Sequence, residues 1–468
     1  MLISARISTA GAALALLSAS AAVPQSAPSA DSWVSEYPRV AAQAERDCAN
    51  TADESCRREL LRMLELVDGR PDIAYRLAKV EATLGHHDAS LKNLEAYARS
   101  GLDLGDPAQE HAFESLRADA HFQRLEAIHR AWLRPEGAHK VRATVPERDI
   151  IAEDLALDPR DGSLYVSSVH AGKVLRFDSE GRWSEFLLPR DLSAWGLYAL
   201  VVDPSRDRMW ISSVAGAVSP PYRSSDHGRS AVLRVDLRSR TIERRYELAD
   251  GKEHALGDMA LSADGAVYVS DGLGGGVYRI GPEANAQLSP LVLAGLMRSP
   301  QTPVPLPDGT RLLVPDYSRG IAIVDLKHPG TVTWLVHEPA LAAYGIDGLY
   351  LRGHDLIAVQ NGTSPERLLL MHLDTDFTRV ESWTVLLARA PGLGDPTHGV
   401  VVGGQFEFIA NSGWDRVDGQ GHLDTTAAAG NPAIWRLVLP DGQRAHLLAV
   451  PLRNIGANRS VLPRMGPL

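Results

Sequence analysis

One pattern recurs six times from about residue 150 onward: a turn leads into an alternating apolar strand, and a second strand follows. The copies begin at residues 153, 198, 257, 301, 347 and 398, so successive copies lie about 45, 59, 44, 46 and 51 residues apart. A unit repeated at this interval is typical of β-propellers, in which each unit forms a four-stranded blade. The pattern predicts a mainly β protein with a six-bladed propeller over residues 145–455.

The radial arrangement of a propeller brings the first residue of every innermost strand to one channel mouth. Chemistry is therefore expected at these six entrance positions. They hold Glu153, Tyr198, Gly257, Gln301, Asp347 and His398.

The region before the repeats has a different sequence pattern. Residues 31–137 show helical periodicity and few glycines. Small and apolar residues share one face over residues 73–85, and a second helix is expected from Asp88, its predicted N-cap, to Ala98. A further helix is expected over residues 116–128. The spacing of the first pair resembles one tetratricopeptide repeat, so we expect a small helical cap that packs on the propeller or on a protein partner. Residues 138–145 are predicted to form a strand that closes the ring against the last blade.

Charge and targeting patterns narrow the classes of partner. The net charge is −10, and no basic run overrides it, which argues against nucleic acid and anionic membranes as partners. Residues 1–22 read as a secretory signal, with Arg6 before an apolar core and small residues at 19–22. No later apolar stretch approaches the roughly 20 residues that span a bilayer. The mature protein is therefore expected in the periplasm or outside the cell.

Two cysteines, Cys48 and Cys56, are the only ones in the chain. In an oxidising compartment they are expected to form a short-loop disulfide, the alternative being two buried thiols. Without a nearby cluster of further ligands they do not make a zinc site.

Two segments carry a family resemblance. Residues 152–157, Ala-Glu-Asp-Leu-Ala-Leu, and the blade start Asp347-Gly348-Leu349 resemble the calcium-dependent six-bladed propellers. These are the gluconolactonase group (senescence marker protein, regucalcin), the paraoxonases and, more distantly, strictosidine synthase. The resemblance covers about residues 148–452 and leaves the helical region outside.

The resemblance implies a central divalent cation, calcium or another, held by a Glu of the first blade, Asn residues of two middle blades and an Asp of the fifth. Glu153 and Asp347 match the acidic positions. Gln301 stands at the fourth-blade Asn position and keeps a side-chain carbonyl oxygen, whereas Gly257 at the third-blade position offers no side-chain ligand. Calcium prefers six to eight oxygen ligands, so these departures weaken the expected site.

The implied reaction is hydrolysis of a lactone or small ester, in which a cation polarises the carbonyl and a base activates water. Asp347 is the predicted ligand and base. His398 is predicted to act as acid, base or ligand, or else only to hydrogen-bond within the axial layer. Tyr198, Asp258 and Trp195 are expected to line the substrate pocket. The loop over residues 214–230 is either a lid or a tolerated surface insertion.

Two rival interpretations stay open. The first is a non-catalytic binding or scaffold protein with a degenerate metal site, which Gly257 and the helical cap favour. The second is a metal-free synthase or hydrolase that works through an axial carboxylate. Fold alone does not choose among them.

Overall fold

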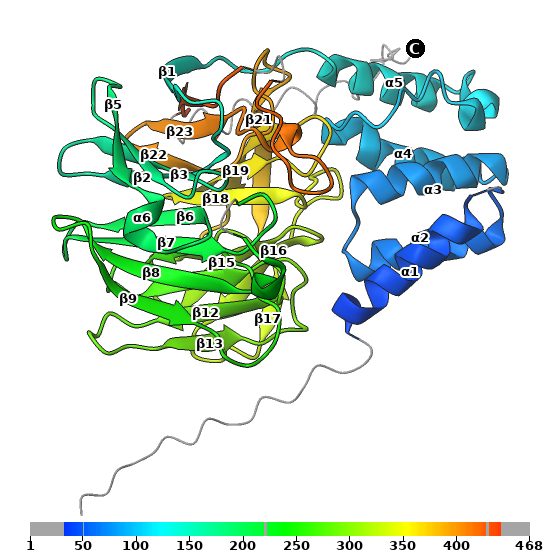
Figure 1. The fold of residues 1–468 in the computed structure, drawn as a ribbon. Coiled ribbons are helices and arrows are strands. Elements are labelled where there is room, and N and C mark those ends of the chain that lie inside the picture. The colour runs from blue at the N-terminus through cyan, green and yellow to red at the C-terminus, as the bar shows by residue number, and fades with distance from the viewer. Residues whose placement is uncertain (1–31, 50, 220–221, 427–429, 441–468) are drawn as a thin grey trace, which may run out of the picture.

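The computed structural model describes residues 32–49, 51–219, 222–426 and 430–440. It is a six-bladed β-propeller of four-stranded antiparallel sheets, preceded by helices (Figure 1). The predicted fold class is confirmed. The expected signal at residues 1–22 and the end of the predicted propeller, residues 441–455, lie outside the described residues.

Each of the first five blades takes its four strands in chain order, from the axis outward. Blade 1 is β2 (Ala152–Asp158), β3 (Ser163–Ser168), β4 (Val174–Phe177) and β5 (Trp183–Leu187), and blade 2 is β6 (Gly196–Asp203), β7 (Arg208–Val214), β8 (Ser230–Asp236) and β9 (Ile242–Glu247). Blade 3 is β10 (Leu256–Leu261), β11 (Val267–Asp271), β12 (Gly276–Ile280) and β13 (Leu288–Val292). Blade 4 is β14 (Val304–Pro305), β15 (Arg311–Asp316), β16 (Gly320–Asp325) and β17 (Val332–Trp334), and blade 5 is β18 (Ile346–Arg352), β19 (Asp355–Gln360), β20 (Arg367–Leu373) and β21 (Val380–Ala388).

Blade 6 closes the ring with strands from both ends of the propeller. It contains β22 (Gly399–Val402), β23 (Gln405–Ala410) and β24 (Ala433–Val438), and its outermost strand is β1 (Lys140–Thr144). Lys140 pairs with Arg436, and Thr144 pairs with Ala433. The predicted ring-closing strand is therefore confirmed.

The turns between the first two strands of several blades follow from an Asp-Gly pair. Asp161 accepts a hydrogen bond from the backbone N–H of Ser163, and the following glycine, Gly162, has a φ of 72°. Asp264 and Asp308 accept equivalent bonds, from Ala266 and Thr310. Glycine adopts a positive φ without strain, so an Asp-Gly pair closes such a turn readily.

Within the described residues, five helices precede the propeller: α1 (Trp33–Asp47), α2 (Glu54–Leu66), α3 (Pro71–Thr83), α4 (His87–Ser100) and α5 (Ala120–Trp132), with a 3-10 turn over residues 111–116. The first two predicted helices correspond to α3 and α4, and the helix predicted over residues 116–128 corresponds to α5, which begins four residues later. The prediction of Asp88 as N-cap is wrong, because α4 already begins at His87 and Asp88 lies in its first turn. Cys48 and Cys56 form the expected disulfide between α1 and α2. Among the described residues, no helix combines the length and apolar character needed to cross a bilayer.

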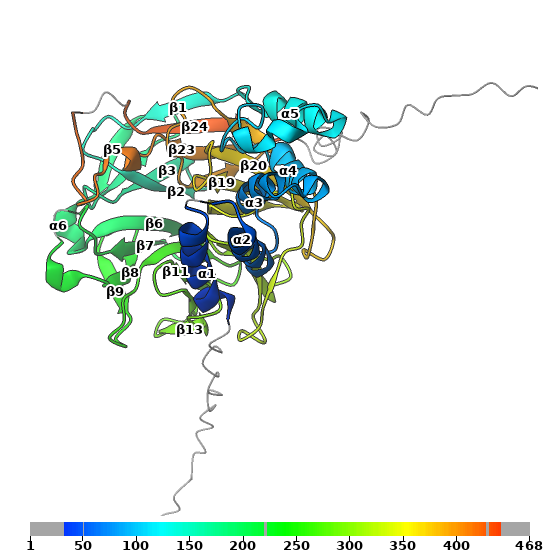
Figure 2. The ribbon, with the colours of Figure 1, turned by 90° about the vertical axis from the view of Figure 1, so that its right-hand side faces the viewer.

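The helices lie together against one side of the propeller (Figure 2). Tyr344, from the connection between β17 and β18, is buried in the same apolar cluster as the helices. The guanidinium of Arg70 stacks 3.7 Å from the centre of the Tyr344 ring, and Trp132 of α5 stacks on Trp383 of β21 at 6.1 Å. The helices therefore share their core with blades 4 and 5.

The innermost strands all run in the same direction, so their two ends define two faces of the ring. The helices contact the connections that lead into the innermost strands, such as residues 335–345, and we call this side the helix face. The turns that follow the innermost strands, such as residues 159–162 and 204–207, form the other side, which we call the far face.

Candidate metal centre

The entrance of four innermost strands carries a β-bulge. The register shifts between Ala152 and Leu155, between Leu197 and Leu200, between Leu256 and Met259, and between Ile346 and Gly348. An extra residue at a bulge re-aims the neighbouring side chains, and bulges are common beside active sites. The residues in these bulges are therefore the ones turned toward the axis.

A serine on the second strand fixes the entrance of the next blade in three cases. Its hydroxyl donates to the backbone carbonyl of the next entrance residue, from Ser167 to Tyr198, from Ser212 to Gly257 and from Ser270 to Gln301. These bonds hold the bulged backbone in place. The repeated serine was a signal in the sequence that could have marked the entrance positions.

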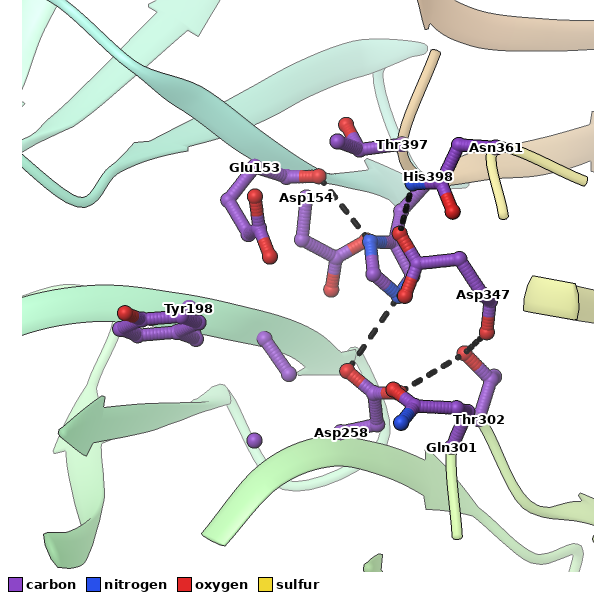
Figure 3. A network of polar contacts seen from close by, with 12 residues as sticks. Glu153, Asp154, Tyr198, Asp258, Gln301, Thr302, Asp347, Asn361, Thr397 and His398 are labelled. Atoms are coloured by element: carbon purple, nitrogen blue, oxygen red, sulfur yellow. Dashed lines mark hydrogen bonds and ion pairs between the residues drawn. The ribbon is translucent and has the colours of Figure 1, made fainter. Parts of the chain in front are cut away.

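Three entrance side chains from blades 3, 5 and 6 meet on the axis (Figure 3). His398 Nε2 lies 3.3 Å from Asp258 Oδ1 and 4.0 Å from Asp347 Oδ1. One ligand atom from each of the three residues lies within 4.8 Å of the other two. Asp258 and His398 are buried, and Asp347 keeps 15% of its side chain exposed. We call these three residues the axial triad.

The orientation of the His398 ring is set by the backbone of blade 1. Its Nδ1 lies 3.1 Å from the carbonyl oxygen of Glu153, an acceptor, so Nδ1 carries the proton of this bond. In the neutral ring, Nε2 then presents a lone pair to the two aspartates. Nε2 is buried and makes no well-oriented hydrogen bond. A buried lone pair facing two carboxylates calls for a positive species between them, a proton or a metal ion.

The two aspartates are held by neighbouring polar groups. Asn361, just after β19, donates from Nδ2 to Asp347 Oδ2 at 2.8 Å, and Tyr317 in turn donates to Asn361 at 2.9 Å. The Thr302 hydroxyl lies 3.0 Å from the backbone oxygen of Asp347 and 3.4 Å from Asp258 Oδ2. Partners of this kind fix the orientation of metal-binding carboxylates.

Two acidic residues of blade 1 lie beside the triad with different partners. Glu153 Oε2 accepts a hydrogen bond of 2.6 Å from the Trp414 indole nitrogen. Asp154 accepts backbone N–H bonds from Leu155 and Leu200, at 2.7 and 2.6 Å, so its carboxylate joins blades 1 and 2. Glu153 thus remains next to the triad, and Asp154 has a structural bonding pattern.

Burial and mutual repulsion raise the acid pKa values on the axis. Burial, followed by the charge of Asp347, raises the pKa of Glu153 to about 8. Burial raises the pKa of Asp347 to about 6, with His398 acting against the shift and Asp258 adding to it. Burial lowers the pKa of His398, but Asp347 and Asp258 together outweigh it and raise that pKa well above its usual value. Closely spaced groups with shifted pKa values are characteristic of functional sites.

The remaining sequence-predicted residues lie in different places. The Gln301 amide donates to the hydroxyl of Ser299 at 2.9 Å. Tyr198 packs near Trp414, with ring centres 6.3 Å apart. Trp195 lies between the guanidinium groups of Arg229 and Arg245, each 5.0 Å from a ring centre, in a hollow at blade 2. The structure thus brings Asp347 and His398 together with Asp258, which the sequence analysis assigned to the substrate pocket, with a supporting role beside the metal ligands rather than a place among them.

The chemistry of the triad fits a divalent cation. It offers one imidazole nitrogen with its other ring nitrogen already bonded, and two carboxylates, a donor set that first-row divalent metals accept. Glu153 lies close enough to affect the charge balance. The axial triad could therefore hold a metal ion.

Two loops meet on the helix face beside blade 1. The loop after β7, residues 215–229, and the loop between β23 and β24, residues 411–432, meet through an apolar cluster that contains Val218, Trp414, Val417 and Leu423. Tyr198 packs against the same cluster. The described part of the blade 2 insertion therefore packs over the blade 1 side of the channel mouth.

The fold and the site define a six-bladed propeller with a histidine and two aspartates gathered on its axis. No protein-family model matches the sequence, and no curated protein matches it. Among solved structures, a luciferin-regenerating enzyme is similar at 13% identity and a TM-score of 0.45, covering 65% of this chain and 96% of that one.

Two further solved structures show similar values. A streptogramin B lyase has 14% identity and a TM-score of 0.43, covering 65% of this chain and 98% of its own. A gluconolactonase from Xanthomonas campestris has 17% identity and a TM-score of 0.41, covering 65% and 94%. The chemistry of the axial site therefore has to be inferred from its own side chains.

Proposed function

We propose that this protein is an exported hydrolase that opens a lactone or small ester at a divalent cation held by the axial triad. The main support for this proposal is the buried Nε2 of His398. This nitrogen faces the carboxylates of Asp258 and Asp347 and has no well-oriented hydrogen-bond partner. A cation between the three groups would satisfy all of them.

The donor set favours one class of metal. Calcium takes oxygen ligands almost entirely, whereas an imidazole nitrogen is a good ligand for zinc, iron and other first-row metals. With His398 in the triad, the proposal is a first-row divalent cation in preference to the calcium that the family resemblance implies. Metal binding requires a neutral imidazole, so affinity should fall when His398 is protonated.

Different side chains would bind the cation, orient its ligands and accept the proton. A bound divalent cation supplies a Lewis acid that polarises the substrate carbonyl. Asp347 and Asp258 serve as ligands, and Asn361 keeps the Asp347 carboxylate in orientation. Glu153 would take the proton from the attacking water in its ionised form, which a bound cation beside it would favour over the protonated form that a pKa of about 8 gives at neutral pH. The Trp414 indole holds the Glu153 carboxylate beside the triad.

Metal content and activity test the proposal together. The purified protein should contain about one equivalent of a first-row metal by mass spectrometry, should melt at a lower temperature after chelation, and should hydrolyse members of an aliphatic and aromatic lactone panel only with metal present. Asp347→Asn should remove the bound metal and the chelator-dependent shift. Asp395→Asn is the matched control, because Asp395 is a nearby acidic residue outside the triad.

One observation supports the rival, a non-catalytic binding protein. A protonated His398 would bridge Asp258 and Asp347 by itself, as a buried ion triad without metal. In that case the protein would carry no metal, its melting curve would ignore chelator, and no lactone would be turned over. That combined result would contradict the hydrolase proposal and support a non-catalytic binding protein.

A further inference from the structure

A cavity leads from the axial triad toward the far face of the propeller. Its volume is about 410 Å³, within the range typical of small-molecule sites. It begins at Asp258, Thr302 and His398 and follows the innermost strands of blades 1, 2 and 3 as far as Pro159 and Pro204. These two prolines directly follow β2 and β6, so the cavity reaches the side opposite the helices.

Beyond its polar inner end, most of the side chains that line this cavity are apolar. The charged residues among its lining are Asp154, Asp258 and His398, and all three belong to the entrance end of their strands. Beyond them the wall is formed by side chains that include Ala156, Leu157, Val201, Met259, Leu261 and Val400. Leu157, Val201 and Leu261 are only half-buried, although they belong to innermost strands. Their side chains therefore keep exposed surface in the channel.

The two ends of the axis differ in their surroundings. Trp414 and Val218 lie in the apolar cluster above blade 1, and Trp414 is bonded to Glu153. Within the residues that the structure describes, the cavity wall runs from the triad to the far face. A ligand that enters by this path first contacts apolar side chains and reaches the charged residues only at the inner end.

We propose that the ligand of the axial site is a neutral molecule with an aliphatic chain, which enters from the far face and leaves its chain among Leu157, Val201 and Leu261. Resting on the proposed function, the substrate is an alkyl-substituted lactone or ester whose carbonyl group reaches the triad. Each buried methylene contributes about 0.8 kcal/mol, which is about a fourfold gain in affinity.

The same wall selects against other ligand classes. A sugar lactone would place hydroxyl groups against the side chains of Leu157, Val201 and Leu261, which offer no hydrogen-bond partners, and unpaired polar groups are costly in such surroundings. An anionic ligand would meet the buried carboxylates of Asp154 and Asp258 at the inner end. The cavity therefore favours chains without charge or hydroxyl groups.

Binding of 2-alkylcyclopentanones tests the route without any hydrolysis, because these ketones have the shape of an alkyl lactone and no ester bond. Calorimetry on the wild-type protein should show affinity rising about fourfold per methylene from propyl upward until the cavity is full. Val201→Lys should reduce the affinity of the heptyl ketone at least tenfold and flatten the series. Val438→Lys, at a valine that is 71% exposed on β24, should bind like wild type.

The outcomes separate this inference from the proposed function. A wild-type affinity that does not change with chain length overturns the inference, and this holds even if Val201→Lys fails to fold. If ketone affinity rises with chain length as expected but no γ-lactone is hydrolysed, the inference about the ligand stands and the hydrolase proposal is wrong. Turnover of hydroxylated sugar lactones in preference to γ-nonalactone, with Val201→Lys as active as wild type, keeps the hydrolase and overturns the inference.

Discussion

Two buried charged centres of this protein differ in the charges around them. At the junction of the helices and blade 5, the fully buried Arg367 donates to neutral groups, from Nε to Gln360 at 2.6 Å and from Nη1 to the backbone oxygen of Ser100 at 2.7 Å, whereas its Nη2 has no hydrogen-bond partner among the described residues. On the axis, His398 Nε2 faces Asp258 and Asp347 without a well-oriented bond.

The difference separates a structural charge from a functional one. Burial lowers the pKa of Arg367 to about 10, and its fixed bonds tie α4 to the propeller. On the axis, burial and neighbouring carboxylates instead raise the pKa values of Asp347 and of Glu153 beside the triad. Charges arranged this way destabilise the metal-free fold and become favourable when a cation arrives. Removing each centre should therefore change stability in opposite directions.

The largest expected effect is on metal affinity. Asp347→Asn removes one charged ligand, so the dissociation constant for the divalent cation should rise at least 100-fold. The metal-free variant should nevertheless be at least as stable as metal-free wild type at pH 8, because the ionised carboxylate, with its pKa raised to about 6, no longer opposes folding. Titration with zinc and melting with and without chelator measure both. If the metal-free variant is less stable than metal-free wild type, the axial carboxylate stabilises the fold as Arg367 does, and the proposed difference between the two centres is wrong.

The second effect concerns the helix junction. Arg367→Met keeps much of the side-chain volume but leaves Gln360 and Ser100 without their donor, and we expect a loss of about 3 kcal/mol in unfolding free energy. Urea denaturation followed by circular dichroism measures it. Bound metal and its affinity should stay at the wild-type level. A parallel loss of metal would show that the two centres are coupled.

The third effect is pH-dependent and lies in blade 3. His254 bonds Asp250 at 2.9 Å and Asp271 at 2.5 Å. Burial lowers the pKa of His254, but these two carboxylates outweigh it and raise that pKa. The group's contribution is therefore full below about pH 6.5 and is lost as the pH rises through its folded value.

His254→Gln should accordingly cost about 1.5 kcal/mol at pH 5.5 and clearly less at pH 9. Denaturant midpoints at the two pH values measure the difference. Equal losses at both would mean that His254 contributes by packing alone. Both ring nitrogens of His254 are bonded to carboxylates other than those of the triad, so the effect of chelator on the melting temperature should be unchanged in this variant.

The smallest effect is at an exposed pair across the same helix junction. Arg99 of α4 lies 2.9 Å from Glu338, with 36% and 42% of their side chains exposed. Exposed ion pairs contribute little, so Arg99→Ala should change the unfolding free energy by less than about 1 kcal/mol. It is the matched control for Arg367→Met. A loss as large as that of Arg367→Met would mean that any arginine at this junction matters, whether buried or not.

Much of the architecture could be predicted because it repeats. Six strand entrances, three Asp-Gly turns and the ring-closing strand, predicted over residues 138–145 and observed over residues 140–144, follow from local patterns, and the structure confirms each. The site was harder to predict. The family resemblance put Gly257 at a ligand position, yet Asp258 is the residue that meets Asp347 and His398.

The β-bulge explains this difference. Side chains alternate along a strand, so one extra residue changes which neighbour faces the axis. The shift between Leu256 and Met259 turns Asp258 toward the triad, and the shift between Ala152 and Leu155 leaves Glu153 bonded to Trp414 of blade 6. No local pattern in the sequence reports a bulge or a partner more than 200 residues away.

The amino-acid sequence by itself determined the number of blades, the way the ring closes, and the presence of acids and a histidine at the blade entrances. Periodicity and turn chemistry are local, so they can be read along the chain. The tertiary structure alone decided which of these side chains share one small space, and that the space opens into an apolar cavity toward the far face. Distances between strands of different blades depend on bulges and on the packing of the whole ring, and those are set only when the propeller closes.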